Sequence, residues 1–488
     1  MTFLRAILRN ILFVLFLLGV GSSVYLQNGC ARIVPPQGGP KDTLPPVLVR
    51  ATPRDSLLNA PKIGLKVVLT FDEYVQALDN ASQNVLMNPT PKMTPIYESN
   101  LKVVTVKIKD TLEPNTTYTI NFGKTIKDVD EGNVLRNFTY IFSTGSYLDS
   151  GRLNGRVRIA QTNKSDSSMI AILEQHTDDS AVAKEIPRYV ARIDTLGRFH
   201  FRNIAPGTYA IYTLKDNGDK RYRDKSVMFS FYDHPVTVTA KADPQDSIFL
   251  YAYAEEGPRP KTTKPPVKTN NNNKKEKGKK EEKKKLHLAN NLKSGKQDIL
   301  SELVLTYDEP IGKVDSTLIF LTDTLYNRVP FKLSEDTSKK IFTITYPGQW
   351  PTDAGFKLII GKDFATDTSG VTLLKSDTLP FQTNKESDYG ELTLRLRNFD
   401  LSKHPVLQFV QSDKIVDSIK VTGSVIHRDY YHPGDYELRV LYDTNDNGTW
   451  DGGSFFGVHR QPEIVVQPVI KKIRVRGNGW ENEYDVVL

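Results

Sequence analysis

A nine-residue segment near the C-terminus has the oxygen-bearing residues of a calcium loop at the required spacing. Residues 443–451 are Asp-Thr-Asn-Asp-Asn-Gly-Thr-Trp-Asp. Asp443, Asn445, Asn447 and Asp451 offer side-chain oxygens at relative positions 1, 3, 5 and 9, and Thr449 offers a carbonyl at position 7. Calcium takes six or more oxygen ligands, and Gly at position 6 permits the tight turn that gathers them. The pattern therefore predicts Ca²⁺ bound by these five residues.

A plain turn explains the same segment without a metal. Position 12 is Ser454, where an EF-hand loop has a bidentate Glu, and the preceding residues 436–440 indicate a strand where an EF-hand has a helix. Asn and Asp also favour hairpin turns on their own. Both interpretations stay open. The shorter counterpart at 216–219, Asp-Asn-Gly-Asp between basic residues, is a weaker metal candidate.

The remaining sequence contains no motif that indicates catalysis. It lacks a Gly-x-Ser-x-Gly elbow, a His-Glu-x-x-His pair and a phosphate-binding Gly-rich loop, and its eight His have no metal-ligand spacing. The carboxylate pairs 72–73 and 308–309 are neighbours on predicted strands, so their side chains point to opposite faces. Their recurrence suggests a structural role. We expect a protein that is not an enzyme, with no catalytic residue and no organic cofactor.

Cys30, the only cysteine, follows an N-terminal apolar run at the distance of a lipoprotein cleavage site. Arg5 and Arg9 precede an apolar stretch of ten residues at 11–20, which is too short to span a bilayer unaided. We expect a signal peptide over 1–29, lipidation of Cys30 and a Pro/Gly-rich stalk over 30–44. A plain signal peptide or anchor with an incidental thiol is the alternative.

The positive charge of the chain is concentrated in one segment. The whole sequence carries +8, but residues 257–285 contain twelve Lys or Arg against three Glu, a net charge of +9. Without this segment and the signal peptide, the chain carries −3. Few apolar residues lie there, so we expect a disordered linker over 257–286. This distribution argues against nucleic-acid binding.

The two sides of this linker repeat each other. Residues 68–73 (Val-Leu-Thr-Phe-Asp-Glu) recur at 304–309 (Val-Leu-Thr-Tyr-Asp-Glu), and Pro-Gly-Thr-Tyr at 206–209 recurs as Pro-Gly-Asp-Tyr at 433–436. We name the four predicted domains A (45–146), B (150–256), A′ (287–384) and B′ (388–488). Short alternating runs at 65–69, 103–108, 117–122, 153–157, 197–201 and 208–212 predict strands, and hence an all-β chain of tandem β-sandwiches.

Units A and B each resemble a known family of domains. Unit A, with its Thr70–Glu73 strand, the 112–118 turn Leu-Glu-Pro-Asn-Thr-Thr-Tyr and the final 140–144 strand, resembles bacterial Ig-like domains of surface and S-layer proteins. Unit B, with Gly-Arg-Phe-His-Phe at 197–201 before Pro-Gly-Thr-Tyr, resembles the transthyretin-like or carboxypeptidase-regulatory-like sandwich. With Cys30, the arrangement is similar to Ig-like-domain lipoproteins of Bacteroidota. That resemblance implies two Ig-like plus transthyretin-like pairs at the outer membrane, on its periplasmic face or at the cell surface.

Sandwich domains without a catalytic motif are typical of binding or scaffold modules. Their edge strands accept strands from partners, so another envelope protein is the expected partner. The alternative is a glycan- or matrix-binding adhesin, with Trp450, Phe455 and Phe456 as an exposed aromatic platform. Asp-Ser/Thr-apolar triplets also recur, as at Asp194-Thr195-Leu196, and resemble an O-glycosylation sequon; they equally fit turns before strands.

The lipid anchor gives a first prediction. Cys30→Ser should move the protein from the membrane to the soluble fraction and remove the mass that acylation adds, because several acyl chains on one cysteine supply the attachment. Fractionation and intact-mass spectrometry measure both. A mutant that stays in the membrane fraction would contradict this account.

Overall fold

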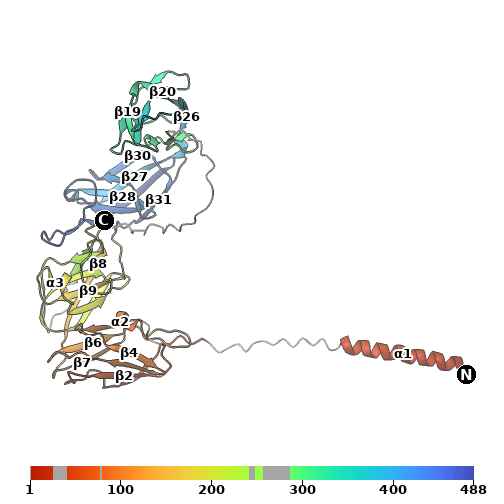
Figure 1. Ribbon diagram of the computed structural model, residues 1–488, viewed down its shortest axis with the longest axis vertical. Helices are drawn as coiled ribbons and strands as arrows, with labels where there is room; N and C mark the ends of the chain where they lie inside the picture. Colours follow the sequence, from red (N-terminus) through yellow and green to blue (C-terminus); the bar gives the residue numbers. More distant parts are fainter. Residues whose placement is uncertain (1, 26–40, 77, 79, 241–247, 257–285) are drawn as a thin grey trace, which may run out of the picture.

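The computed structural model describes residues 2–25, 41–76, 78, 80–240, 248–256 and 286–488. It confirms the all-β prediction, since β-sheets dominate all four units (Figure 1). The long helix α1 (Thr2–Tyr25) includes the apolar run of the predicted signal peptide. None of the described helices is long and apolar enough to cross a membrane. Cys30, the stalk up to residue 40 and the linker up to residue 285 lie outside the described residues.

Unit A is a sandwich of two antiparallel sheets. The sheets have the strand orders β1-β2-β5-β4 and β3-β6-β7. Along β2 and β5, inward apolar residues alternate with more exposed ones, and Val67, Leu69 and Tyr118 share one core between the sheets. Its elements are β1 (Leu48–Thr52), β2 (Lys66–Phe71), α2 (Ala81–Asn84), β3 (Leu86–Asn88), β4 (Ile96–Asn100), β5 (Val103–Lys107), β6 (Thr117–Asn121) and β7 (Thr139–Ser143).

Unit B pairs a three-stranded sheet, β11-β8-β15, with a larger sheet, β10-β9-β12-β13, in which β14 also pairs with β12. Strand β15 runs parallel to β8, and the other pairs are antiparallel. Its elements are β8 (Gly151–Ile159), β9 (Met169–Glu174), α3 (Ala181–Lys184), β10 (Tyr189–Arg192), β11 (Arg198–Ile204), β12 (Gly207–Lys215), β13 (Phe229–Phe231), β14 (Val236–Val238) and β15 (Ile248–Ala252).

Unit A′ repeats the four-stranded sheet of A as β16-β18-β23-β22 and adds the sheets β17-β26-β24-β20-β21 and β19-β25. Leu286, the last residue of the predicted linker, is buried in its core. Its elements are β16 (Leu288–Asn290), β17 (Lys296–Gln297), β18 (Leu303–Tyr307), β19 (Ile311–Val314), η1 (Ser316–Leu318), β20 (Ile319–Asp323), β21 (Arg328–Val329), β22 (Lys332–Glu335), β23 (Ile341–Thr345), β24 (Gly355–Ile360), β25 (Ala365–Asp367) and β26 (Asp377–Thr383).

Unit B′ has the topology of B. Its sheets are β30-β27-β34, with β34 parallel to β27, and β29-β28-β31-β32, in which β33 also pairs with β31. Its elements are η2 (Glu386–Asp388), β27 (Gly390–Arg397), η3 (Leu401–Lys403), β28 (Pro405–Gln411), β29 (Lys414–Lys420), β30 (Val425–Tyr431), β31 (Gly434–Tyr442), β32 (Ile464–Val466), β33 (Lys472–Val475) and β34 (Glu481–Val487).

The repeated carboxylates have the same structural role in both copies. The Asp72 carboxylate accepts the backbone N–H of Val47 at 2.7 Å, and the Asp308 carboxylate accepts that of His287 at 3.0 Å. A lysine then donates to the carbonyl of each Asp, Lys102 to Asp72 and Lys340 to Asp308, both at 2.6 Å. Each Asp thus fastens the first strand of its unit to the core strand.

A tyrosine forms the same hydrogen bond in units B and B′. The Tyr209 hydroxyl donates to the carbonyl of Ala205 at 2.9 Å, and the Tyr436 hydroxyl donates to that of His432 at 2.8 Å. Each bond spans the Pro-Gly turn that opens β12 or β31 and resembles the tyrosine corner of β-sandwiches. The sequence repeat is therefore a repeat of hydrogen bonds as well as of strands.

The units do not follow one another in space as they do in sequence. Along the long axis of Figure 1 the order is A, B, B′, A′, so the second transthyretin-like candidate, B′, lies between B and A′. This order brings the 443–463 segment of B′ against unit B.

Candidate functional site

The predicted calcium residues meet in one turn between β31 and β32. The Asp443 side chain is buried, and its carboxylate accepts the N–H groups of Asn447 at 3.2 Å and Gly448 at 2.6 Å. The amides of Asn445 and Asn447 both donate to Oδ2 of Asp451, at 2.6 and 2.7 Å. The Thr449 hydroxyl donates to Oδ1 of Asn447 at 2.8 Å. All five predicted residues therefore lie within a single hydrogen-bonded turn.

Glu463 closes this turn, and sequence reasoning missed it. Its carboxylate accepts the N–H and hydroxyl of Thr444 at 2.7 and 2.8 Å and the N–H of Asp451 at 3.0 Å. The Trp450 indole N–H donates to the Glu463 carbonyl at 2.8 Å. Glu463 lies outside the motif, and a single Glu before a strand gives no local signal. In the described part of the chain, no group of three or more His, Cys, Asp or Glu could hold a metal, so calcium binding by this turn depends on its Asn amides and stays a prediction.

The counterpart turn in unit B is an Asx turn. The Asp216 carboxylate accepts the N–H groups of Gly218 at 2.8 Å and Lys220 at 2.9 Å. Asp219 forms an ion pair with Arg223 at 3.5 Å. Asp194 of the Asp-Thr-Leu triplet likewise accepts the N–H of Leu196 at 2.8 Å, as expected of a turn before a strand.

The aromatic residues after the turn insert into unit B, which corrects the hypothesis of an exposed platform. Phe455 is only 1 % exposed, and its ring lies 5.1 to 5.5 Å from those of Tyr212, Phe229 and Phe231. Phe456 stacks on Tyr222 at 5.8 Å. These rings form one cluster contributed by both units, in which Phe455 is buried and Phe456 and Trp450 are partly buried. The platform prediction was wrong because unit B offers an apolar surface that buries Phe455 and partly covers Phe456 and Trp450.

Polar contacts surround this aromatic cluster. Oε1 of Glu255 in unit B accepts the Phe455 N–H at 3.2 Å and the Tyr222 hydroxyl at 3.0 Å. The Gln461 amide donates to Asp233 at 2.7 Å. A side chain at Gly453 would place its Cβ 2.5 Å from the Tyr253 ring, so this close approach requires glycine. We call residues 450–461 with their unit B contacts the B–B′ junction.

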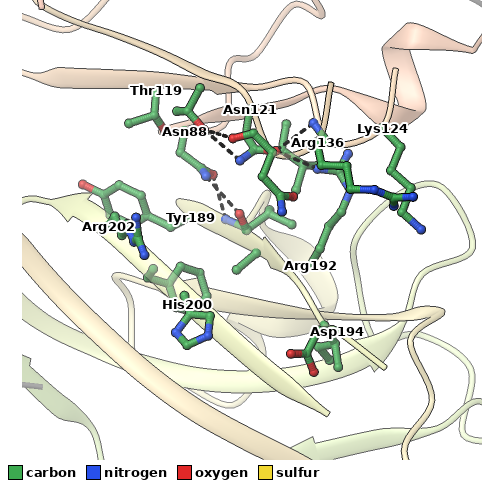
Figure 2. A pocket seen from close by; sticks show the side chains of 18 of the residues that line it. Asn88, Thr119, Asn121, Lys124, Arg136, Tyr189, Arg192, Asp194, His200 and Arg202 are labelled. Carbon is green, nitrogen blue, oxygen red and sulfur yellow. Dashed lines mark hydrogen bonds between the residues drawn. The ribbon is translucent and has the colours of Figure 1, made fainter. Parts of the chain in front are cut away.

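A second site, which sequence reasoning also missed, is a cleft of about 1000 Å³ between units A and B (Figure 2). Unit A contributes residues of β3 and β6 and the 123–137 loop, and unit B contributes β10 and β11. The Asn88 amide, which lines this cleft, links the two units: it donates to the Val190 carbonyl at 2.9 Å and accepts the Val190 N–H at 2.7 Å. Arg188 also forms a two-pronged ion pair with Glu113 at 2.9 and 3.3 Å.

The charged side chains that line this cleft are almost all basic: Lys124, Lys127, Arg136, Arg192, Arg198 and Arg202, with Asp194 as the one carboxylate. They are spread over nearly eighty residues and no motif connects them. The overall charge of the sequence concealed them, because the folded units are mildly acidic once the linker is removed.

Comparison with known proteins supports the predicted Ig-like fold of unit A. Residues 42–144 match the family of bacterial Ig-like domains. Unit A is therefore similar to bacterial Ig-like domains. No curated protein matches the chain.

Solved structures with similar segments give no further assignment. They include the Bacillus anthracis TIE protein (9 % identity, 93 % of this chain and 76 % of that one, TM-score 0.17). Another is BcpA, the major pilin subunit of Bacillus cereus (10 % identity, 69 % and 99 %, TM-score 0.16). A third is the S-layer protein rSbsC(31-844) (15 % identity, 90 % and 54 %, TM-score 0.16).

The turn at 443–451 gives a prediction for calcium. Rotating the Asn445 and Asn447 amides about their last torsion would exchange nitrogen for oxygen beside Asp451 and give an oxygen-only ligand set. Calcium at a hundredfold excess over its dissociation constant should then stabilise the protein by about 2.7 kcal/mol. Calorimetry should show a rise in unfolding temperature with Ca²⁺, a smaller one with Mg²⁺ and none for Asp451→Asn. Equal responses of the wild type and Asp451→Asn would show that the turn binds no calcium.

The B–B′ junction gives a prediction for stability. Phe455→Ala should destabilise the junction by about 3–5 kcal/mol, because it leaves a cavity among the aromatic rings of unit B. In the wild type we expect units B and B′ to unfold in one shared thermal transition. In Phe455→Ala the two units should unfold in separate transitions. Val458→Ala is the matched control, since Val458 lies in the same segment but is 72 % exposed. If both variants unfold like the wild type, the junction does not hold the units together.

Proposed function

We propose that this protein is a lipid-anchored, non-catalytic binding module that presents an edge strand to another cell-envelope protein. The bacterial Ig-like domain and the sandwich architecture support a binding role. The proposed anchor is the lipid on Cys30, at the outer membrane. The observation that carries the proposal is a difference between the two copies in how one edge strand is covered.

In the first copy, unit A closes the outer edge of the larger sheet of unit B. That edge is β10, and its Val190 exchanges two hydrogen bonds with the Asn88 amide. The next contact along the edge is the N–H of Thr90, which donates to the carbonyl of Arg188 at 2.8 Å. An extended segment of another domain therefore covers this edge.

In the second copy, the strand at the same position is β29, and unit A′ contacts B′ elsewhere. The carboxylate of Asp298 accepts the hydroxyl of Tyr389 at 2.6 Å and pairs with His432 at 3.1 Å. Burial disfavours the charged carboxyl, but the hydrogen bonds from His432 and Tyr389 lower the pKa of Asp298 to about 2. This contact lies at the loops before β27 and β31, not at β29.

Strand β29 consequently pairs only with β28 among the described strands, and it exposes Ile415 (46 %) and Val416 (51 %). Its register shifts near Val416, and Lys414 and Lys420 stand at its ends. Bulges and terminal lysines limit unspecific edge pairing. An added strand could bury both apolar side chains, in the same way that partners extend other sheets.

The test is affinity purification of the lipidated protein from mild detergent, followed by hydrogen exchange on the complex. We expect one envelope protein in near-stoichiometric amount and protection of the amides of residues 414–420. Ile415→Lys with Val416→Lys should abolish its recovery, because the buried face of the added strand would meet two charges.

The matched control is Val49→Lys, which charges a 66 % exposed residue on β1, an edge strand of unit A. It should leave recovery unchanged. Recovery that survives the β29 double variant, or no stoichiometric partner at all, would overturn the proposal.

A further inference from the structure

We propose that the cleft between units A and B binds an acidic oligosaccharide, a carbohydrate that carries carboxylate or phosphate groups. Basic side chains from two domains converge on this cleft, and amide and hydroxyl groups lie between them. The inference does not rest on the proposed strand addition, since β29 belongs to unit B′ and contributes nothing to the cleft.

The charge of the cleft is unbalanced. Its six Lys and Arg residues face the single carboxylate of Asp194. Both the Leu196 and the Arg198 N–H donate to Oδ1 of Asp194 at 2.8 Å, so that carboxylate is already used in a turn. None of the six cations forms an ion pair with another described residue, whereas elsewhere unit B pairs Arg188 with Glu113 and Arg223 with Asp219. An anionic ligand would supply the missing countercharge.

The cations come together from both domains. In Figure 2, Lys124 and Arg136 of unit A and Arg192 of unit B lie on the same side of the cleft. Arg192 donates to Oδ1 of Asn121 at 3.1 Å, and its guanidinium packs so closely on Gly123 that a Cβ there would lie 2.8 Å from it. The surrounding protein lowers the pKa of Arg192 by desolvation. A planar guanidinium held in this way is suited to bidentate contact with a carboxylate or phosphate.

The neutral part of the lining indicates a sugar. Thr119, Thr139, Asn137 and Asn203 border the same space, and His200 faces it in Figure 2. Amides and hydroxyls both donate and accept hydrogen bonds, which matches the hydroxyl groups of a carbohydrate ring. At about 1000 Å³ the cleft has room for a short oligosaccharide.

Two other anionic ligands fit less well. An acidic peptide that adds to the sheet would need the free edge of β10, which Asn88 and Thr90 already occupy. A flat anionic membrane surface cannot enter a concave cleft between two domains. The headgroup of an acidic glycolipid can enter it, so free glycan and glycolipid are two sources of the same chemistry.

The experiment is titration calorimetry of the full-length mature chain with a trisaccharide of galacturonic acid and with the neutral galactose trisaccharide. We expect binding of the acidic sugar only, weakened by added salt. Arg136→Gln and Arg202→Gln should each weaken it about tenfold, the loss of roughly one charge-assisted hydrogen bond. Arg192→Gln should weaken it at least as much, but it also touches unit A, so the first two variants carry the test. Arg50→Gln, which removes an exposed cation of β1 outside the cleft, is the matched control.

Further arms of the experiment distinguish the possible ligands. Flotation with vesicles that contain lipopolysaccharide, compared with phosphatidylcholine vesicles, shows whether a glycolipid also serves; binding lost in Arg136→Gln would support the cleft with that source. Equal affinity for the neutral trisaccharide, equal loss in Arg50→Gln, or tighter binding of a poly-glutamate peptide or of single-stranded DNA would overturn the proposal.

Discussion

The insertion of Phe455 into the aromatic cluster of unit B is the contact on which the arrangement of units B and B′ depends. A fully buried phenylalanine is worth several kcal/mol, whereas the exposed ion pairs around it contribute little. The side chain reaches unit B because the turn at 443–451 and the carboxylate of Glu463 fix the start of the segment that carries it. Burial of this ring brings B′ against B and gives the order A, B, B′, A′.

The two related pairs differ in how their units contact each other, which makes them available for different tasks. Unit A contacts strand β10 of unit B, and a basic cleft lies beside this contact. Unit A′ instead touches B′ through Asp298, which leaves β29 without a second strand among the described residues. A duplicated sandwich pair thus acquires one closed edge and one open edge through the choice of a few interdomain contacts.

The features predicted from the sequence are those that depend on local pattern. The period-two runs predicted strands that the structure confirms, such as β2, β5 and β12, because alternation directly reflects which face is buried. The recurring Asp72 and Asp308 suggested a structural role, and both hold the first strand of their unit. The turn that begins at Asp443 could also be predicted, because an Asx turn is formed within a few residues.

The features that escaped prediction depend on contacts far apart in sequence. Glu463 acts on Thr444 nineteen residues earlier, and Arg136 and Arg192 meet only because two domains dock. Phe455 was misjudged for the same reason: its exposure is decided by a surface more than two hundred residues away, on β13 and the 222–231 region. The composition gave no indication of the basic cleft, because the linker accounts for the positive net charge and the rest of the mature chain is mildly acidic.

The most direct test of this account is the distance between units B and B′ in solution. Spin labels at Thr237→Cys and Glu481→Cys, two exposed positions, in a Cys30→Ser background would report it by pulsed electron paramagnetic resonance. The account predicts one narrow distance distribution at the separation given by the structure, which broadens when Phe455 is replaced by Ala. A broad distribution in the protein with Phe455 intact would contradict it.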